Sequence, residues 1–212
     1  MPKLDILNKN LAFLEAQMGN PPSVEELFEL SERIGYPVDV LLRVDLAQRG
    51  SLKDIRMLVM DCDGVLTDGK MIFTREGDEI KHFNAQDGMG LKRWHAAGGF
   101  SGIISAGRSS GLVERRAEMM HVNQVYVGKQ PKMEVLEKWL GELELGLSEV
   151  AYVGDDVSDL PVMERVGASF CPQNAVKAVR DKSQIVLGRR GGEGCVRELI
   201  EDYLLPVQTG AS

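Results

Sequence analysis

Two acidic residues, Asp61 and Asp63, come directly after a short apolar run at residues 57–60. Two carboxylates this close to each other repel unless a cation or a proton lies between them. Gly64 follows them, and glycine allows the backbone to turn sharply at the end of a strand. The segment therefore has the composition of a cation-binding loop.

A second acidic cluster, Asp155 and Asp156, follows the apolar run at residues 150–153. Parallel strands place their carboxyl ends at one edge of a sheet, where ligands bind, so the two clusters can converge there. Ligand sets made only of oxygen, with few protein contacts, suit Mg²⁺, which keeps water molecules and takes a phosphate oxygen. The sequence thus predicts a shared Mg²⁺ site.

Lys132 and Ser105 complete a set of residues suited to phosphate chemistry. A lysine is a point charge that balances a phosphate, and a serine at the end of a strand donates a hydrogen bond to it. Each residue alone also has an ordinary structural interpretation, because solvated acidic loops and single lysines are common. The order of acid pair, serine, lysine and acid cluster, mostly after apolar runs, is far more specific.

The elements that must position these residues alternate along the chain. Short apolar runs, suited to buried strands, lie at residues 57–60, 100–104, 124–127 and 150–153. Helical patterns lie at residues 88–97, 111–120, 132–140 and 158–166. This alternation predicts an α/β fold with a Rossmann-like parallel sheet and helices on both faces.

Residues 1–50 read as a short helical extension. Helices are expected at residues 4–18, after Ser23 and at residues 40–44, with Glu26 closing a capping box on Ser23. The extension resembles the last helices of bacterial helix-turn-helix repressors, but it has no room for a recognition helix. We interpret it as a packing module or a truncated relic and not as a DNA-binding domain.

Composition excludes several classes of protein. The formal net charge of -7 disfavours binding to nucleic acid. No apolar run is long enough to cross a membrane, and the first residues do not form a signal peptide. The cysteines at 62, 171 and 195 are widely spaced, which favours a reduced, cytoplasmic protein. Residues 206–212 are expected to form a flexible tail.

A resemblance to a known family extends over the phosphatase-like region, residues 51–205. It rests on residues 61–69, 81–84, 87–90, 107–108, 116–117, 132, 154–163 and 191–198. These motifs resemble the haloacid dehalogenase superfamily and, within it, the capless subfamily of 3-deoxy-D-manno-octulosonate 8-phosphate phosphatases. The related 9-phosphate phosphatases of nonulosonic acids share much of the pattern.

The resemblance implies a role for each candidate residue. Asp61 would be the nucleophile that forms an aspartyl-phosphate, and Asp63 the general acid and then the general base. Asp61, the backbone carbonyl of Asp63 and Asp155 would hold the metal ion. Lys132 and Ser105 would stabilise the charge of the transferring phosphoryl group.

Two of the roles implied by the resemblance stay open. The segment Ser105-Ala106-Gly107-Arg108 is one residue longer than the family pattern, so either Ser105 or Ala106 occupies the position of the hydroxyl. Asp156 and Asp159 either support the metal ligands from behind or have a structural role only.

The chain has little room for the cap domain that most relatives carry. Between Asp63 and Ser105 there is space for one helix and a small β-hairpin flap at residues 70–84, whose apolar side chains suit an interface. The resemblance implies a homotetramer in which neighbouring subunits close each active site. The rival interpretation is that the hairpin packs within its own monomer.

The resemblance also implies the contacts to the substrate: Asn84, Ala85, Gln86, Asp87, Gly88, Lys92, Arg108 and Arg116. Guanidinium groups suit a carboxylate because they bind it through two hydrogen bonds. Gln86 and Lys92 stand where the octulosonate phosphatases carry arginines, so a different acid sugar or weaker selectivity stays open.

The expected function is that of a Mg²⁺-dependent phosphatase of a small phosphorylated sugar acid, of the octulosonate 8-phosphate type used in lipopolysaccharide biosynthesis. The alternatives are a nonulosonic acid 9-phosphate phosphatase, a promiscuous phosphatase of small metabolites, and a non-catalytic oligomerisation module.

Overall fold

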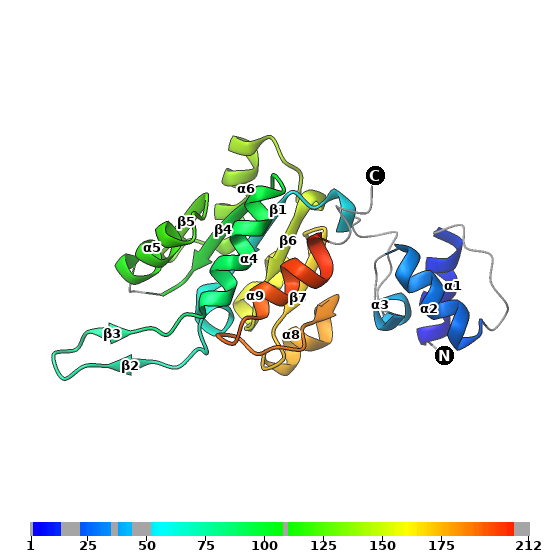
Figure 1. The fold of residues 1–212 in the computed structure, drawn as a ribbon, viewed down its shortest axis with the longest axis horizontal. Helices are drawn as coiled ribbons and strands as arrows, with labels where there is room; N and C mark the ends of the chain where they lie inside the picture. The colour runs from blue at the N-terminus through cyan, green and yellow to red at the C-terminus, as the bar shows by residue number, and fades with distance from the viewer. Residues whose placement is uncertain (1, 14–21, 35–37, 44–51, 108–109, 206–212) are drawn as a thin grey trace.

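The structure, a computed structural model, describes residues 2–13, 22–34, 38–43, 52–107 and 110–205. Its centre is a sheet of six parallel strands in the order β5-β4-β1-β6-β7-β8 (Figure 1). The strands are β1 (Met57–Met60), β4 (Phe100–Ser105), β5 (Gln124–Val127), β6 (Val150–Val153), β7 (Ala168–Cys171) and β8 (Ile185–Val186).

The four predicted strands are confirmed, whereas β7 and β8 were not predicted. The sequence of β7, Ala-Ser-Phe-Cys, has no β-branched residue, and β8 has two residues only, too few to show a pattern. Both strands extend the sheet beyond β6, away from β1.

Side chains of β1 alternate between the two faces of the sheet, as the pleat of a strand requires. Leu58 and Met60 belong to one buried cluster, and Met57 and Val59 belong to the other. The first face packs against α4 (Ala85–Ala96), α5 (Ser110–Met119) and α9 (Cys195–Glu198). The second face packs against α6 (Lys132–Leu143), α7 (Leu160–Met163) and α8 (Lys177–Lys182). The predicted three-layer α/β architecture is therefore confirmed.

Short 3₁₀- and π-helical segments complete the domain, and the one at Cys62–Leu66 is interrupted by non-helical backbone at Asp63 and Gly64. They lie at Leu52–Asp54, Cys62–Leu66, Leu147–Glu149, Val157–Asp159 and Leu199–Leu204. The turns at Cys62–Leu66 and Val157–Asp159 follow β1 and β6, so Asp61 and the pair Asp155 and Asp156 lie between each strand and its turn, at the edge of the sheet.

The predicted hairpin consists of β2 (Ile72–Phe73) and β3 (Glu79–Ile80), paired antiparallel. It extends away from the sheet (Figure 1). Met71 and Phe73 are 69% and 57% exposed. The rival interpretation, in which the hairpin buries its apolar side chains within the monomer, is therefore wrong for this chain.

Across residues 52–107 and 110–205, the structure contains no inserted cap domain. The hairpin and α4 lie between Asp63 and Ser105, and α6 and β6 lie between Lys132 and Asp155. None of the described helices has the length and hydropathy needed to cross a membrane.

The N-terminal extension contains α1 (Pro2–Phe13), α2 (Val24–Ile34) and α3 (Val38–Arg43). The predicted capping box starts α2: Ser23 Oγ accepts a hydrogen bond from the Glu26 N–H at 3.1 Å, and the Ser23 N–H donates to Glu26 Oε2 at 2.7 Å. The Asn10 side chain donates to the Leu41 carbonyl at 2.9 Å and joins α1 to α3. The predicted end of the first helix, at residues 14–18, and the tail at 206–212 lie outside the described residues.

Candidate active site

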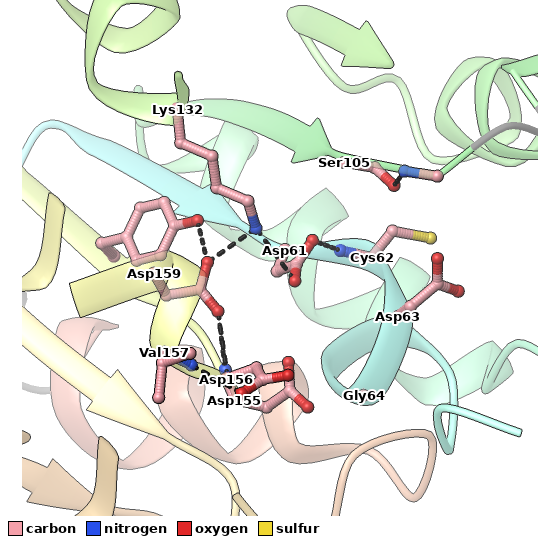
Figure 2. Close-up of polar contacts among 12 residues, drawn as sticks. Asp61, Cys62, Asp63, Gly64, Ser105, Lys132, Asp155, Asp156, Val157 and Asp159 are labelled. Carbon is pink, nitrogen blue, oxygen red and sulfur yellow. Dashed lines mark hydrogen bonds and ion pairs between the residues drawn. The ribbon is translucent and has the colours of Figure 1, made fainter. Parts of the chain in front are cut away.

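The two acidic clusters meet because β1 and β6 are neighbours in the sheet. Met60 lies beside Val153, and the Asp61 N–H donates to the Val153 carbonyl at 3.0 Å. Carboxylate oxygens of Asp61, Asp155 and Asp159 consequently lie within 4.8 Å of one another. The predicted convergence is confirmed, and Figure 2 shows these side chains facing one another.

Asp61 is buried at the end of β1. Its Oδ1 accepts a hydrogen bond from the Cys62 N–H at 2.7 Å, and its Oδ2 lies 3.0 Å from Lys132 Nζ. Burial raises the pKa of Asp61 to about 6, because the loss of hydration outweighs the attraction of Lys132. A carboxylate in this position is poorly hydrated, which suits a nucleophile.

Asp159 is fully buried and uses both of its oxygens (Figure 2). Oδ1 accepts from Lys132 Nζ at 2.7 Å and from the Tyr152 hydroxyl at 2.6 Å. Oδ2 accepts from the backbone N–H groups of Asp155 and Asp156 at 3.0 and 3.2 Å. Asp159 therefore orients the lysine and the acidic loop and has no oxygen left over for an ion.

Asp155 is different, because its buried Oδ1 has no hydrogen-bond partner among the described residues. Burial, and then the nearby Asp61 and Asp159, raise the pKa of Asp155 to about 7. A buried oxygen without a partner is costly unless a cation or a proton satisfies it. The pair of Asp61 and Asp155 therefore fits a hard metal ion.

Gly64 makes room for this arrangement. A Cβ atom at Gly64 would lie 2.0 Å from Asp155 Oδ2, and its φ of +87° favours glycine. Asp156, in contrast, points away from the cluster, where its exposed carboxylate accepts a hydrogen bond from the Val157 N–H at 2.7 Å. Of the two residues left open between support and structure, Asp159 supports the cluster and Asp156 caps a helical turn.

Asp63 turns away from Asp61 (Figure 2) and contacts Lys81, which follows β3 of the hairpin. Its side chain is 39% exposed, and its Oδ1 lies 2.5 Å from Lys81 Nζ. Ser105 is buried, and its Oγ accepts from the Gly107 N–H at 3.1 Å. A Cβ atom at Gly107 would lie 3.2 Å from Ser105 Oγ and 3.3 Å from Asp63 Oδ2. The hydroxyl that borders Asp63 is thus the one of Ser105, whereas Ala106 is exposed.

The predicted contacts to the substrate divide into separate groups. Ala85, Gly88, Lys92 and Arg116 line a cavity of about 250 Å³. A second cavity, of about 660 Å³, is lined by Asp63, Gly69, Met71, Phe73, Gly77, Asp78, Glu79, Lys81 and Gly107. The two sets share no residue, so those four predicted contacts do not border the cavity of Asp63 within one chain. Arg108 lies outside the described residues.

Asp87, another predicted contact, is joined to the C-terminal segment. It is buried, and its Oδ1 accepts from the Arg197 N–H at 2.9 Å, at the start of the C-terminal helical segment. Burial raises the pKa of Asp87 to about 6. Asp87 Oδ1 thus holds the C-terminal segment against α4, while its buried Oδ2 has no hydrogen-bond partner among the described residues, so the contact to the substrate stays a prediction.

The beginning of α4 contains the last two predicted contacts, Asn84 and Gln86. Asn84 Oδ1 accepts from the Gln86 N–H at 2.8 Å and caps the helix, while its carbonyl accepts from Arg116 Nη2 at 2.8 Å. Gln86 Oε1 accepts from Arg189 Nη1 at 2.6 Å. Gln86 therefore holds a guanidinium group that belongs to a distant loop.

Three residues of the site were not assigned roles from the sequence: Lys81, Tyr152 and Arg189. One feature of the sequence pointed to Tyr152: its hydroxyl is the only polar side-chain group in the apolar run of β6. Lys81 belonged to a recognised motif, but nothing in its spacing indicated that it reaches Asp63.

Comparisons with known proteins agree with this geometry. The haloacid dehalogenase-like hydrolase family profile matches residues 116–199. The 3-deoxy-D-manno-octulosonate 8-phosphate phosphatase KdsC of Yersinia pestis is 35% identical over 161 residues, which are 76% of this chain and 84% of the relative. A probable YrbI family phosphatase from Pseudomonas syringae is 44% identical, with a TM-score of 0.73 over 79% of this chain and 93% of that one.

A further solved structure carries ligands. The 3-deoxy-D-manno-octulosonate 8-phosphate phosphatase of Moraxella catarrhalis, in complex with a magnesium ion, a phosphate ion and a KDO molecule, is 35% identical. Its TM-score is 0.72 over 75% of this chain and 90% of that one.

Proposed function

Because the chain belongs to the haloacid dehalogenase superfamily, and within it to the capless phosphatases of the KdsC type, we propose that it is a Mg²⁺-dependent phosphatase of a phosphorylated sugar acid. The substrate would be of the 3-deoxy-D-manno-octulosonate 8-phosphate type. One observation carries this proposal: Asp61 and Asp155 converge within reach of a single ion, with the buried cation of Lys132 beside Asp61.

The metal ion would be held by the carboxylates of Asp61 and Asp155 and by the backbone carbonyl of Asp63. The unpartnered Oδ1 of Asp155 and the raised pKa values of Asp61 and Asp155 support this assignment, because a cation would compensate both carboxylates. When bound, Mg²⁺ neutralises charge between an anionic phosphate and the carboxylate that attacks it.

The reaction would proceed in two displacements. An oxygen of Asp61 attacks phosphorus, the bond from phosphorus to the sugar oxygen breaks, and Asp63 donates its proton to that oxygen. Asp63 then takes a proton from water as the water oxygen attacks phosphorus. The bond between phosphorus and the Asp61 oxygen breaks, which releases inorganic phosphate and restores the carboxylate.

Lys132 and Ser105 would hold the transferring phosphoryl group. The buried Lys132 is fixed between Asp61 and Asp159, and these carboxylates raise its pKa against the opposite effect of burial. It therefore stays charged across the physiological range of pH. A fixed cation and a fixed donor need no reorganisation when charge moves during phosphoryl transfer.

We also propose a homotetramer in which a neighbour completes each site. The exposed Met71 and Phe73 of the hairpin support an interface, and both line the cavity next to Asp63. The separate position of Lys92 and Arg116 supports their delivery to a neighbouring site. Sedimentation equilibrium should give four chains per particle, and Phe73→Glu should shift the protein to smaller species.

Asp61→Asn tests the catalytic proposal. With Mg²⁺ and a panel of sugar-acid and neutral sugar phosphates, wild-type protein should release phosphate fastest from one sugar acid, while the variant should lose turnover by at least about 10³-fold. Asp181→Asn, at an exposed position on α8, is the matched control and should keep wild-type rates. Magnesium-dependent release by the Asp61 variant would exclude it as the nucleophile, and rates within about tenfold across the panel would favour a promiscuous phosphatase.

A further inference from the structure

Lys81 is a buried cation on the hairpin side of the site. It follows β3, and its side chain is only 5% exposed. Its Nζ lies 2.5 Å from Asp63 Oδ1 and 2.8 Å from Glu79 Oε1. Lysine side chains are rarely buried to this extent unless they are paired. The hairpin is thereby attached to the catalytic loop at the residue proposed to transfer protons.

The two oxygens of Asp63 have different surroundings. Oδ1 accepts from Lys81 Nζ and, at 3.4 Å, from the Thr67 hydroxyl. Oδ2 has no hydrogen bond within the described part of the chain and borders Gly107 and Ser105. Holding one oxygen with an ammonium group leaves the other oxygen fixed in one direction, toward Gly107 and the Ser105 hydroxyl.

A direct role of Lys81 in binding an anionic substrate fits the contacts less well. Asp63 and Glu79 both lie within ion-pair distance of the one ammonium group, so its positive charge already has two partners. Such a cluster does not attract a second anion. The Lys132 ammonium beside Asp61 is better placed to receive phosphate oxygens.

We propose that Lys81 is a positioning residue for Asp63: it fixes Oδ1 so that Oδ2 is the oxygen that exchanges the proton. This inference rests on the proposed phosphatase function. Because Lys81 is carried by the hairpin, the placement of the acid–base group depends on how the hairpin is seated against the catalytic loop.

The test compares Lys81→Met, Lys81→Arg and Lys70→Met in the full-length protein with saturating Mg²⁺ and the preferred sugar-acid phosphate. Lys70 is the matched control, because it lies at the base of the same hairpin, is 77% exposed and pairs with Asp68. Lys81→Met should lower kcat by about 10- to 100-fold with KM changed by less than about twofold. Lys81→Arg should recover part of the loss, and Lys70→Met should keep the wild-type rate.

A double-mutant cycle decides whether Lys81 acts through Asp63. Once Asp63→Asn has removed the group that is positioned, adding Lys81→Met should cost less than about twofold more. A multiplicative loss, an increase of KM with kcat retained, or an equal loss in Lys81→Met and Lys70→Met would each overturn the positioning role while the phosphatase function stands. Wild-type protein without any phosphatase activity would overturn both.

Discussion

Asp61 and Asp63 are two residues apart, yet the protein holds them in opposite ways. Asp61 is buried at the end of the central strand, beside β6 and against Lys132. Asp63 is partly exposed and is held by Lys81, which belongs to a hairpin outside the sheet. The proposed nucleophile, Asp61, is therefore fixed by the core, whereas the proposed acid–base group, Asp63, depends on the position of the hairpin, which is exposed in this chain.

Among changes to the buried part of the site, which contains Asp61 and Asp155, Gly64→Ala is expected to have the largest effect. The added Cβ would lie 2.0 Å from Asp155 Oδ2, so the carboxylate must move away from Asp61. We expect Mg²⁺-dependent turnover to fall by about 100-fold or more, since metal ligands must keep their geometry. Steady-state rates and calorimetric titration with Mg²⁺ measure the effect.

Gly98→Ala is the control for backbone strain. Gly98 has a φ of +88°, almost the same as the +87° of Gly64, but a Cβ there would meet no atom within 4 Å. Both variants should lose about 1–2 kcal/mol of stability from the left-handed backbone, and only Gly64→Ala should lose the metal. Equal Mg²⁺ affinities in the two variants would contradict the crowded geometry at Asp155.

Mg²⁺ affinity should depend on pH through the two buried carboxylates, Asp61 and Asp155. Asp61 and Asp155 bind a cation only when ionised, and burial raises their pKa values to about 6 and about 7. As the pH falls from 7.5 to 5.5, protons compete for both oxygens, so affinity should fall by about tenfold or more. Thermal shifts with and without MgCl₂ at several pH values test this expectation, and a shift that grows toward acidic pH would contradict it.

Tyr152→Phe removes a hydrogen bond to Asp159, the residue that holds Lys132, and leaves Asp61 unchanged. It therefore tests how much the fixed position of Lys132 contributes. The hydroxyl donates to Asp159 Oδ1 at 2.6 Å in a fully buried position, so its loss should cost about 1–3 kcal/mol in the free energy of unfolding. We expect kcat to fall by about tenfold, because Asp159 loses one of its hydrogen bonds and then holds the Lys132 ammonium group less firmly. Chemical denaturation and steady-state kinetics measure both effects.

Tyr126→Phe is the matched control for Tyr152. Its hydroxyl accepts from the Gln130 N–H at 3.0 Å, and Tyr126 lies on β5, which β4 and β1 separate from β6. This variant should keep wild-type kcat, and a Tyr152→Phe enzyme with the same kcat would mean that Asp159 holds Lys132 unaided.

Removal of residues 1–48 should have the smallest effect. None of the described residues of α1, α2 and α3 lines either cavity near the site. We expect kcat and KM within about twofold of the full-length values, since substitutions and truncations away from a site rarely change its chemistry. Gel filtration of the shortened protein shows whether the extension contributes to the assembly, and loss of activity at unchanged size would contradict a role in packing alone.

The N-terminal extension shows which features of a helix follow from its own sequence and which depend on its neighbours. The helix predicted after Ser23 is present as α2, but its apolar residues Val24 and Phe28 are 65% and 59% exposed. The capping box at Ser23 and Glu26 was predicted correctly because it involves neighbours in the chain. Local hydrogen bonds follow from local sequence, whereas burial depends on what packs against a helix.

The amino-acid sequence by itself determined four of the six strands, the acidic residues at the ends of β1 and β6, and the turn at Gly64. These features follow from hydrophobic runs and backbone freedom over a few residues. Only the tertiary structure decided which oxygens are occupied. Both oxygens of Asp159 accept hydrogen bonds, from Lys132, Tyr152 and the backbone. The buried Oδ1 of Asp155 has no partner among the described residues, and Asp87 is buried against the C-terminal segment.

The physical reason is that hydrogen-bond partners are chosen in space. Lys81 reaches Asp63 across 18 residues of the chain, and Arg197 reaches Asp87 across 110. Such pairs form only after strands and helices have packed, so residue types and spacing can name the chemical groups of this site but not the contacts that orient them.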